Sequence, residues 1–174
     1  MIRDRGLDTE AAEPKYTRLE FERRWLVDTA ASPALTGLDV ILTEDRYIEG
    51  TRLRLRRMTR GGRTVFKLTR KYVTARPEAR PIVTAYLTER EHAVFAALPA
   101  RVMTKRRFNL AIAGRCWSLD VFEGQLAGLE LVEAEAADEV ALAALVPPTW
   151  AGKEVTHDAR YQCGALAQTN AIPE

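Results

Sequence analysis

The stretch LEFERRWLVD, residues 19–28, decides which fold we expect for this chain. Successive side chains of an extended strand point to opposite faces of the sheet. Alternation therefore places Glu20, Glu22 and Arg24 on one face, while most of the apolar residues lie on the other. A strand at an ordinary sheet surface has the same pattern, with its charged face in water. The stretch alone leaves open whether its charged face meets solvent or a ligand.

The composition indicates one globular domain with local clusters of charge. The chain has 174 residues, 47% hydrophobic and 29% charged, and its 26 basic and 24 acidic residues leave a net charge of only +2. That balance disfavours a general coat for nucleic acid. We see no signal peptide and no apolar segment of membrane-spanning length, and the two cysteines lack the spacing of a metal site. We expect a cytoplasmic protein with no membrane partner.

Alternation of apolar and polar residues recurs along the chain after a patternless segment, residues 1–15, which we expect to be a flexible tail. Residues 16–174 then form the domain. The alternation predicts eight strands. They lie near residues 17–27, 39–48, 51–59, 63–72, 80–87, 102–110, 115–123 and 126–135.

Three short helices are predicted between or after these strands, within residues 88–99, 137–148 and 156–168. Thr88 and Glu91 have the spacing of a capping box, and Thr156 or Asp158 can cap the last helix. Eight strands and few short helices predict an α+β fold, in which an antiparallel sheet closes or nearly closes into a barrel.

Charged faces like that of the first strand recur on later strands. The same-face sets are Arg52, Arg54 and Arg56; Lys67, Thr69 and Lys71; Lys105 and Arg107; Ser118 and Asp120; Glu133 and Glu135. For any single strand, a solvated face is the ordinary interpretation. Like charges on one face repel, however, and those opposite each other on neighbouring strands destabilise the sheet. We therefore favour a barrel whose charged faces turn inward around a polyanion.

The charges on these faces fit a triphosphate bound with a divalent cation. Together with the first strand, the inward faces carry eight basic and five acidic residues, a surplus of three positive charges. One divalent cation raises the surplus to about five, close to the charge of a triphosphate near neutral pH. Buried charge must be compensated in this way. Carboxylates suit a hard cation, and guanidinium and ammonium groups suit phosphate oxygens.

In their order along the chain, these motifs resemble those of the CYTH family, the triphosphate tunnel metalloenzymes. EFERR is similar to the family's opening E-x-E-x-K at Glu20 and Glu22. Later strands resemble the family at RLRLR (52–56), LTRK (68–71) and KRR (105–107), and the closing segments at 119–136 and 152–161. The resemblance covers about residues 17–168.

The resemblance implies an eight-stranded antiparallel tunnel with short helices packed outside, Mg²⁺ or Mn²⁺ as cofactor, and a triphosphate-containing small molecule as partner. It implies hydrolysis, with inorganic tripolyphosphate ahead of thiamine triphosphate hydrolysis or adenylate cyclisation. The metal ligands would be Glu20, Glu22, Glu133 and Glu135. The phosphate-binding residues would be Arg52, Arg54, Arg56, Lys67, Lys71, Lys105 and Arg107. Arg24 and Asp120 are expected to act in catalysis.

Two departures from the family pattern keep an alternative open. Arg24 stands where the family has Lys, and an arginine can hold phosphate but cannot act as a base. The fifth predicted strand has Thr84 and Tyr86 where the family often has carboxylates. Both departures favour a non-catalytic polyphosphate or nucleotide sensor on the same fold. A nucleic-acid partner is disfavoured, since carboxylates share the basic face and stacking aromatics are absent from it. Homodimerisation stays open.

Overall fold

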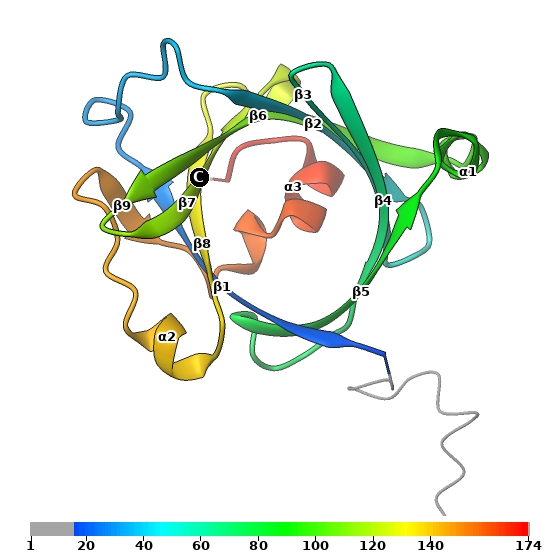
Figure 1. Ribbon diagram of the computed structural model, residues 1–174. Helices are drawn as coiled ribbons and strands as arrows, with labels where there is room; N and C mark the ends of the chain where they lie inside the picture. Colours follow the sequence, from blue (N-terminus) through cyan, green and yellow to red (C-terminus); the bar gives the residue numbers. More distant parts are fainter. Residues whose placement is uncertain (1–15, 174) are drawn as a thin grey trace, which may run out of the picture.

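Eight antiparallel strands close into a barrel in the computed structural model, which describes residues 16–173 (Figure 1). Around the barrel the strands follow the order β5-β4-β3-β2-β6-β7-β8-β1, and β1 pairs again with β5. The strands are β1 (Arg18–Val27), β2 (Val40–Ile48), β3 (Leu53–Arg60), β4 (Arg63–Lys71), β5 (Ala79–Leu87), β6 (Ala100–Ile112), β7 (Arg115–Phe122) and β8 (Glu130–Ala136). A ninth strand, β9 (Ala151–Glu154), adds to the edge of β1. The α+β barrel expected from the alternation is confirmed.

The register of β1 shows which side chains share the inner face. Glu20 lies opposite Arg80 of β5, Glu22 opposite Glu135 of β8, and Arg24 opposite Glu133. Directly opposed residues on neighbouring antiparallel strands point to the same face. The charged face of the opening stretch therefore turns toward the barrel interior, not toward solvent.

The helices divide between the outside and the inside of the barrel. They are α1 (Glu89–Ala96), α2 (Glu139–Ala143) and α3 (Cys163–Thr169), with 3₁₀ turns η1 (Gly124–Leu126) and η2 (Ala159–Tyr161). The expected capping box of α1 is present, with Thr88 and Glu91 bonded reciprocally. On the outside, α2 packs Leu142 into a cluster with Trp25, Trp117 and Val132.

The third helix corrects the expectation that all helices pack outside. Figure 1 shows α3 within the ring of strands. Its Leu166 packs against Met103, Phe122 and Leu131, which are the inward positions of β6, β7 and β8 at one end of the barrel. Those positions are apolar, so they bury surface only if an apolar element covers them from inside. The helix supplies that cover and leaves the charged part of the interior open.

Three further expectations about the elements need correction, while seven strands agree with prediction to within two residues at each end. The strand expected at 126–135 begins at Glu130, because η1 and the positive φ of Gly128 (98°) carry the chain through a turn first. The four-residue β9 was not predicted. The last helix is split, with Asp158 capping η2 and α3 starting at Cys163.

The expected flexible tail, residues 1–15, lies outside the described residues. Among the described helices, none has the length and apolar character that crossing a membrane requires.

Candidate active site in the barrel interior

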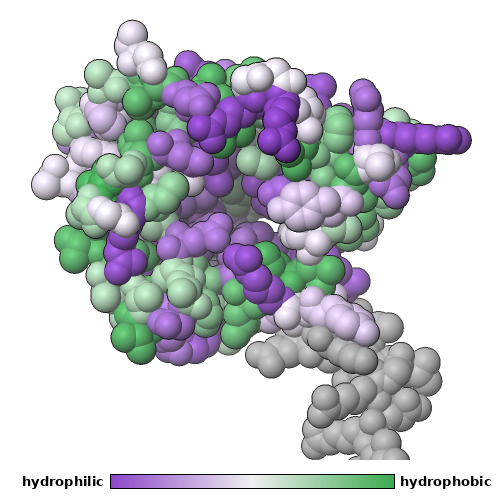
Figure 2. Space-filling model, in the orientation of Figure 1, coloured by the Kyte–Doolittle hydropathy of each residue, from purple (hydrophilic) through white to green (hydrophobic). Residues whose placement is uncertain are grey.

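A cavity of about 580 Å³ lies in the barrel between the charged strand faces and α3. Small-molecule sites commonly have volumes of about 300–1,000 Å³. Figure 2 shows a hollow in this face of the molecule with hydrophilic side chains around and within it. Eleven of the thirteen predicted site residues line the cavity: Glu20, Glu22, Arg24, Arg52, Arg54, Arg56, Lys71, Lys105, Arg107, Glu133 and Glu135.

The two remaining predicted residues, Lys67 and Asp120, do not line the cavity. The Lys67 ammonium lies 5.0 Å from the ring centre of Tyr86, which is 71% exposed. Asp120 is fully buried behind two cations. It accepts hydrogen bonds from the Lys105 ammonium and from Arg107, whose Nε and Nη2 lie 2.6 and 2.7 Å away. Asp120 thus orients two cavity cations, and its expected part in catalysis stays a prediction.

Three carboxylates form a group that could hold a metal ion. Glu20 and Glu22 of β1 and Glu135 of β8 each offer one oxygen within 4.8 Å of the others. Glu135 is an exposed residue, but partial loss of water around its carboxylate raises its pKa, and the charges of Glu20 and Glu22 raise it further. Arg18, whose Nη2 lies 3.5 Å away, offsets only part of this increase. A bound cation would relieve this repulsion, and oxygen ligands are those that Mg²⁺ and Mn²⁺ prefer. The donor set therefore fits a hard divalent cation.

Glu133, expected as a fourth metal ligand, lies outside this group and pairs with cations. Its carboxylate oxygens lie 3.1 Å from Arg24 Nη2 and 2.8 Å from Arg107 Nη2. Burial alone would raise the pKa of Glu133, but Arg24 and Arg107 outweigh it and hold that pKa well below its usual range. Glu133 is therefore ionised and positions two guanidinium groups.

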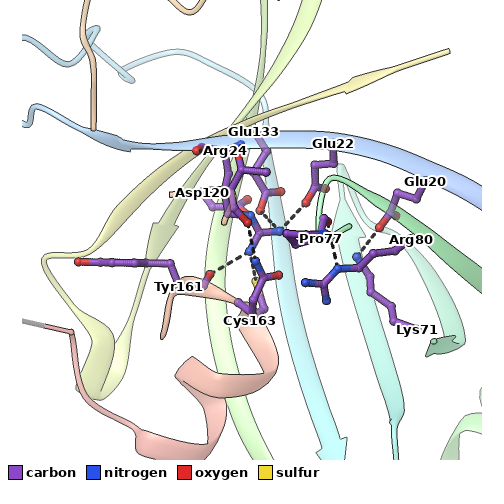
Figure 3. Close-up of polar contacts among 12 residues, drawn as sticks. Glu20, Glu22, Arg24, Lys71, Pro77, Arg80, Asp120, Glu133, Tyr161 and Cys163 are labelled. Atoms are coloured by element: carbon purple, nitrogen blue, oxygen red, sulfur yellow. Dashed lines mark hydrogen bonds and ion pairs between the residues drawn. The ribbon is translucent and has the colours of Figure 1, made fainter. Parts of the chain in front are cut away.

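Arg24 sits at the centre of these contacts and is 5% exposed (Figure 3). Its guanidinium contacts Glu22 and Glu133, and its Nη1 donates to the carbonyl oxygen of Tyr161 at 2.9 Å. Burial lowers the pKa of Arg24, yet the two carboxylates outweigh it and raise that pKa well above its usual value. Arg24 is permanently charged and joins β1 to the segment that carries α3.

Asp45 of β2 was missed in the sequence and anchors two more cations. It is fully buried and accepts from Arg56 Nε and Nη2 at 2.6 and 2.7 Å, while Arg54 Nε lies 3.6 Å away. The signal was present in the register, since Asp45 lies directly opposite Arg56. Asp45 stands between Glu44 and Arg46, so charges fall on both faces of this strand and alternation alone does not mark an inward carboxylate.

The cavity also has lining residues that no motif indicated. The C-terminal segment contributes Gln162, Cys163, Gly164, Ala165, Gln168 and Thr169, which the expectation of an outer helix had excluded. Among the described residues of β5, Arg80 is the one that lines the cavity. Thr84 of β5 instead shares a hydrogen bond of 3.0 Å with Thr69. As expected, β5 brings no carboxylate to the cavity.

Comparisons with known proteins find similar sequences and a similar solved structure. No model of a known protein family matches the chain. The chain is 43% identical over 75 residues to an inorganic triphosphatase of Nitrosomonas europaea, a match that spans 42% of this chain and 50% of the relative. An inorganic triphosphatase of Acetivibrio thermocellus is 40% identical over 60 residues, which are 34% of this chain and 37% of the relative. The chain thus spans half or less of these curated relatives.

A solved structure matches over a greater length. The crystal structure of the inorganic triphosphatase NE1496 superposes with a TM-score of 0.58 and 30% identity. The match covers 89% of this chain and 97% of that one. It covers about twice the share of this chain that the curated matches cover.

Proposed function

We propose that this chain, which belongs to the CYTH family of triphosphate tunnel metalloenzymes, is a metal-dependent hydrolase of inorganic tripolyphosphate. The observation that carries the proposal is one cavity that combines a group of three carboxylates with an excess of cations. The names of the relatives support the choice of inorganic tripolyphosphate.

The charge of the cavity suits this ligand. Its lining carries eight positive and four negative side chains, and the buried carboxylates of Asp45 and Asp120 raise the negative count to six. The surplus of two becomes four with one divalent cation. Tripolyphosphate carries about four to five negative charges at neutral pH, so the filled cavity would be close to neutral.

Glu20, Glu22 and Glu135 would hold Mg²⁺ or Mn²⁺ in this proposal. When bound, such an ion neutralises charge on phosphoryl oxygens and polarises the phosphorus for attack by water. The ion identity rests on the oxygen donor set alone.

The protein's own cations bind and orient the phosphate chain. Arg56, Lys105 and Arg107 face the cavity, and the carboxylates of Asp45 and Asp120 hold them in place before substrate arrives. Phosphoryl transfer depends mainly on positioning and on stabilising the charge of the transition state. Cations held by buried carboxylates need little reorganisation to do this. Arg24 remains protonated throughout, so it orients Glu22 and Glu133 and takes no proton from water.

A non-catalytic sensor of polyphosphate or nucleotides is the second candidate. It is favoured by the absence of carboxylates from the β5 positions that line the cavity and by a permanently charged Arg24. For both candidate functions, hydrolase and sensor, we propose a triphosphate-containing small molecule as partner. We propose neither a nucleic acid nor a membrane as partner. We place the protein in the cytoplasm, a proposal that the free thiols of Cys116 and Cys163 support.

A phosphate-release screen tests the proposal. Purified protein would be incubated with tripolyphosphate, pyrophosphate, ATP or thiamine triphosphate, each with Mg²⁺, Mn²⁺ or EDTA. We expect release from tripolyphosphate to be fastest and to require metal. Binding of tripolyphosphate without release would favour the sensor. Neither binding nor release would refute both candidates.

A further inference from the structure

Arg80 of β5 is a cavity cation that no residue between 16 and 173 neutralises directly. Its Nε donates to the carbonyl oxygen of Pro77 at 3.1 Å. Among the described residues, no carboxylate lies within ion-pair distance of its guanidinium, so Nη1 and Nη2 keep free donors. Figure 3 shows the end of this guanidinium standing clear of Lys71 and Glu20. The other buried or half-buried cavity cations each lie within ion-pair distance of a carboxylate. Arg24, Arg56, Lys71, Lys105 and Arg107 are hydrogen-bonded to one, and Arg54 Nε lies 3.6 Å from Asp45 without a hydrogen bond.

Neighbouring cations contact carboxylates, whereas Arg80 does not. Lys71 contacts Glu20, Arg24 contacts Glu22 and Glu133, and Arg56 is held by Asp45. Arg80 is half-buried, and burial together with the charge of Arg24 lowers its pKa. Removing a charged group from water without a partner is costly. The unpaired guanidinium therefore destabilises the empty protein slightly, and an anionic ligand that binds it would remove this cost.

The location of Arg80 indicates which part of an anion it would meet. In the pairing of β1 with β5, Arg80 lies directly opposite Glu20, one of the three grouped carboxylates. Arg80 also borders a second space of about 10 Å³ together with Glu20, Glu22 and Lys71. Arg52, by contrast, is an exposed residue of the β2–β3 connection. Arg80 is thus on the carboxylate side of the cavity.

We propose that Arg80 is a further substrate-binding residue, whose Nη1 and Nη2 bind oxygens of the phosphoryl group next to Glu20, Glu22 and Glu135. The inference rests on the proposed function and deepens it, because it places one named cation beside one part of the phosphate chain. A planar guanidinium with two free donors matches two phosphate oxygens. Arg80 is not paired with Glu20, Glu22 or Glu135. A metal ion bound by these carboxylates would therefore leave its guanidinium free to bind phosphate.

The test compares Arg80→Gln, Arg80→Lys and a control, Arg70→Gln. Arg70 belongs to the neighbouring strand β4, stacks on Tyr72 with 4.9 Å from its guanidinium carbon to the ring centre, and does not line the cavity. Calorimetry in EDTA gives the Kd of tripolyphosphate, phosphate release with Mg²⁺ gives KM, and thermal unfolding gives Tm. The calorimetric readout does not depend on turnover.

Arg80→Gln should raise the Kd and the KM of tripolyphosphate about tenfold to a hundredfold, the scale of lost charged hydrogen bonds. Its Tm should equal or exceed that of the wild type, because an unpaired cation is removed. Arg80→Lys, which keeps the charge, should bind more tightly than Arg80→Gln, and Arg70→Gln should match the wild type within about twofold in Kd and KM.

Two results would overturn the inference while the proposed function stands. In the first, the wild type hydrolyses tripolyphosphate, and the Kd and KM of Arg80→Gln both lie within twofold of the wild-type values. The other is a Tm lowered in Arg80→Gln together with equal binding defects in Arg80→Lys, which would indicate a structural role. A wild-type protein that neither binds nor hydrolyses tripolyphosphate would instead overturn the proposed function itself.

Discussion

Replacing Asp45 with asparagine should destabilise the protein strongly, although the two side chains have the same shape. The carboxylate of Asp45 is fully buried and accepts two hydrogen bonds from Arg56, at 2.6 and 2.7 Å, with Arg54 at 3.6 Å. An asparagine side chain keeps one acceptor oxygen but presents an amide to the second donor. It also leaves two guanidinium groups without their nearest negative charge.

The magnitude follows from the kind of pair that is broken. Removing one partner of a buried ion pair costs about 3–5 kcal/mol, because the other charge stays buried. The remaining amide oxygen recovers part of this, so we expect Asp45→Asn to lower the free energy of unfolding by about 3 kcal/mol. For a chain of this size that corresponds to a fall in Tm of about 6–12 °C.

The assay is urea and thermal unfolding of Asp45→Asn beside a matched control, Asp39→Asn. Asp39 also pairs with an arginine, Arg60, with its Oδ2 2.6 Å from Nε, but both side chains are more than half exposed. Exposed pairs contribute under about 1 kcal/mol. Added tripolyphosphate should restore part of the stability of Asp45→Asn, since it supplies the missing negative charge. A loss below about 1 kcal/mol for Asp45→Asn, equal to that of the control, would show that the buried Asp45 pairs add no more stability than an exposed pair.

Other predictions concern the carboxylate group and Arg24. Because the folded-state pKa of Glu135 is raised, its contribution to stability is present at low pH and is lost as pH rises through that pKa. At pH 7 without metal, Glu135→Gln should therefore unfold at the same or a higher temperature than wild type, while its metal-dependent rate falls at least about tenfold. A clearly lower Tm of Glu135→Gln would contradict the expected repulsion among these carboxylates. Arg24→Lys should keep substantial activity without a new basic limb in its pH–rate profile, since the charge is retained. Arg24→Ala should weaken tripolyphosphate binding by about 1.5–3 kcal/mol in calorimetry, and an unchanged Kd would show that the positive charge of Arg24 plays no part in binding.

The barrel could be predicted from the sequence because strand alternation is a local signal. Period-two charges at Glu20, Glu22 and Arg24 mark both a strand and its inner face, and the same pattern on later strands identifies most of the cavity lining. Long strands such as β6 carry the pattern over many residues. The four residues of β9 are too few to show it.

What the sequence could not show depends on partners far along the chain. Glu133 and Glu135 follow the same alternation, yet one pairs with Arg24 and Arg107 while the other joins the carboxylate group. Only the register of β8 against β1 and the arrangement of cations separate their roles. Arg80 begins a strand whose following same-face residues, Ile82, Thr84 and Tyr86, carry no charge, so no run of basic residues indicated it. The position of α3 depends on apolar inward residues that looked like ordinary strand positions.

We propose that this cavity cleaves tripolyphosphate with a divalent cation held by Glu20, Glu22 and Glu135. The most direct measurement follows tripolyphosphate by ³¹P NMR with purified protein, first in EDTA and then after adding Mg²⁺ or Mn²⁺, with Glu22→Gln in parallel. We predict that the wild type with metal converts the tripolyphosphate signals into equal amounts of pyrophosphate and orthophosphate, while the EDTA sample and Glu22→Gln leave them unchanged. Persistence of the tripolyphosphate signals with wild-type protein and metal, at protein concentrations equal to substrate, would contradict the account.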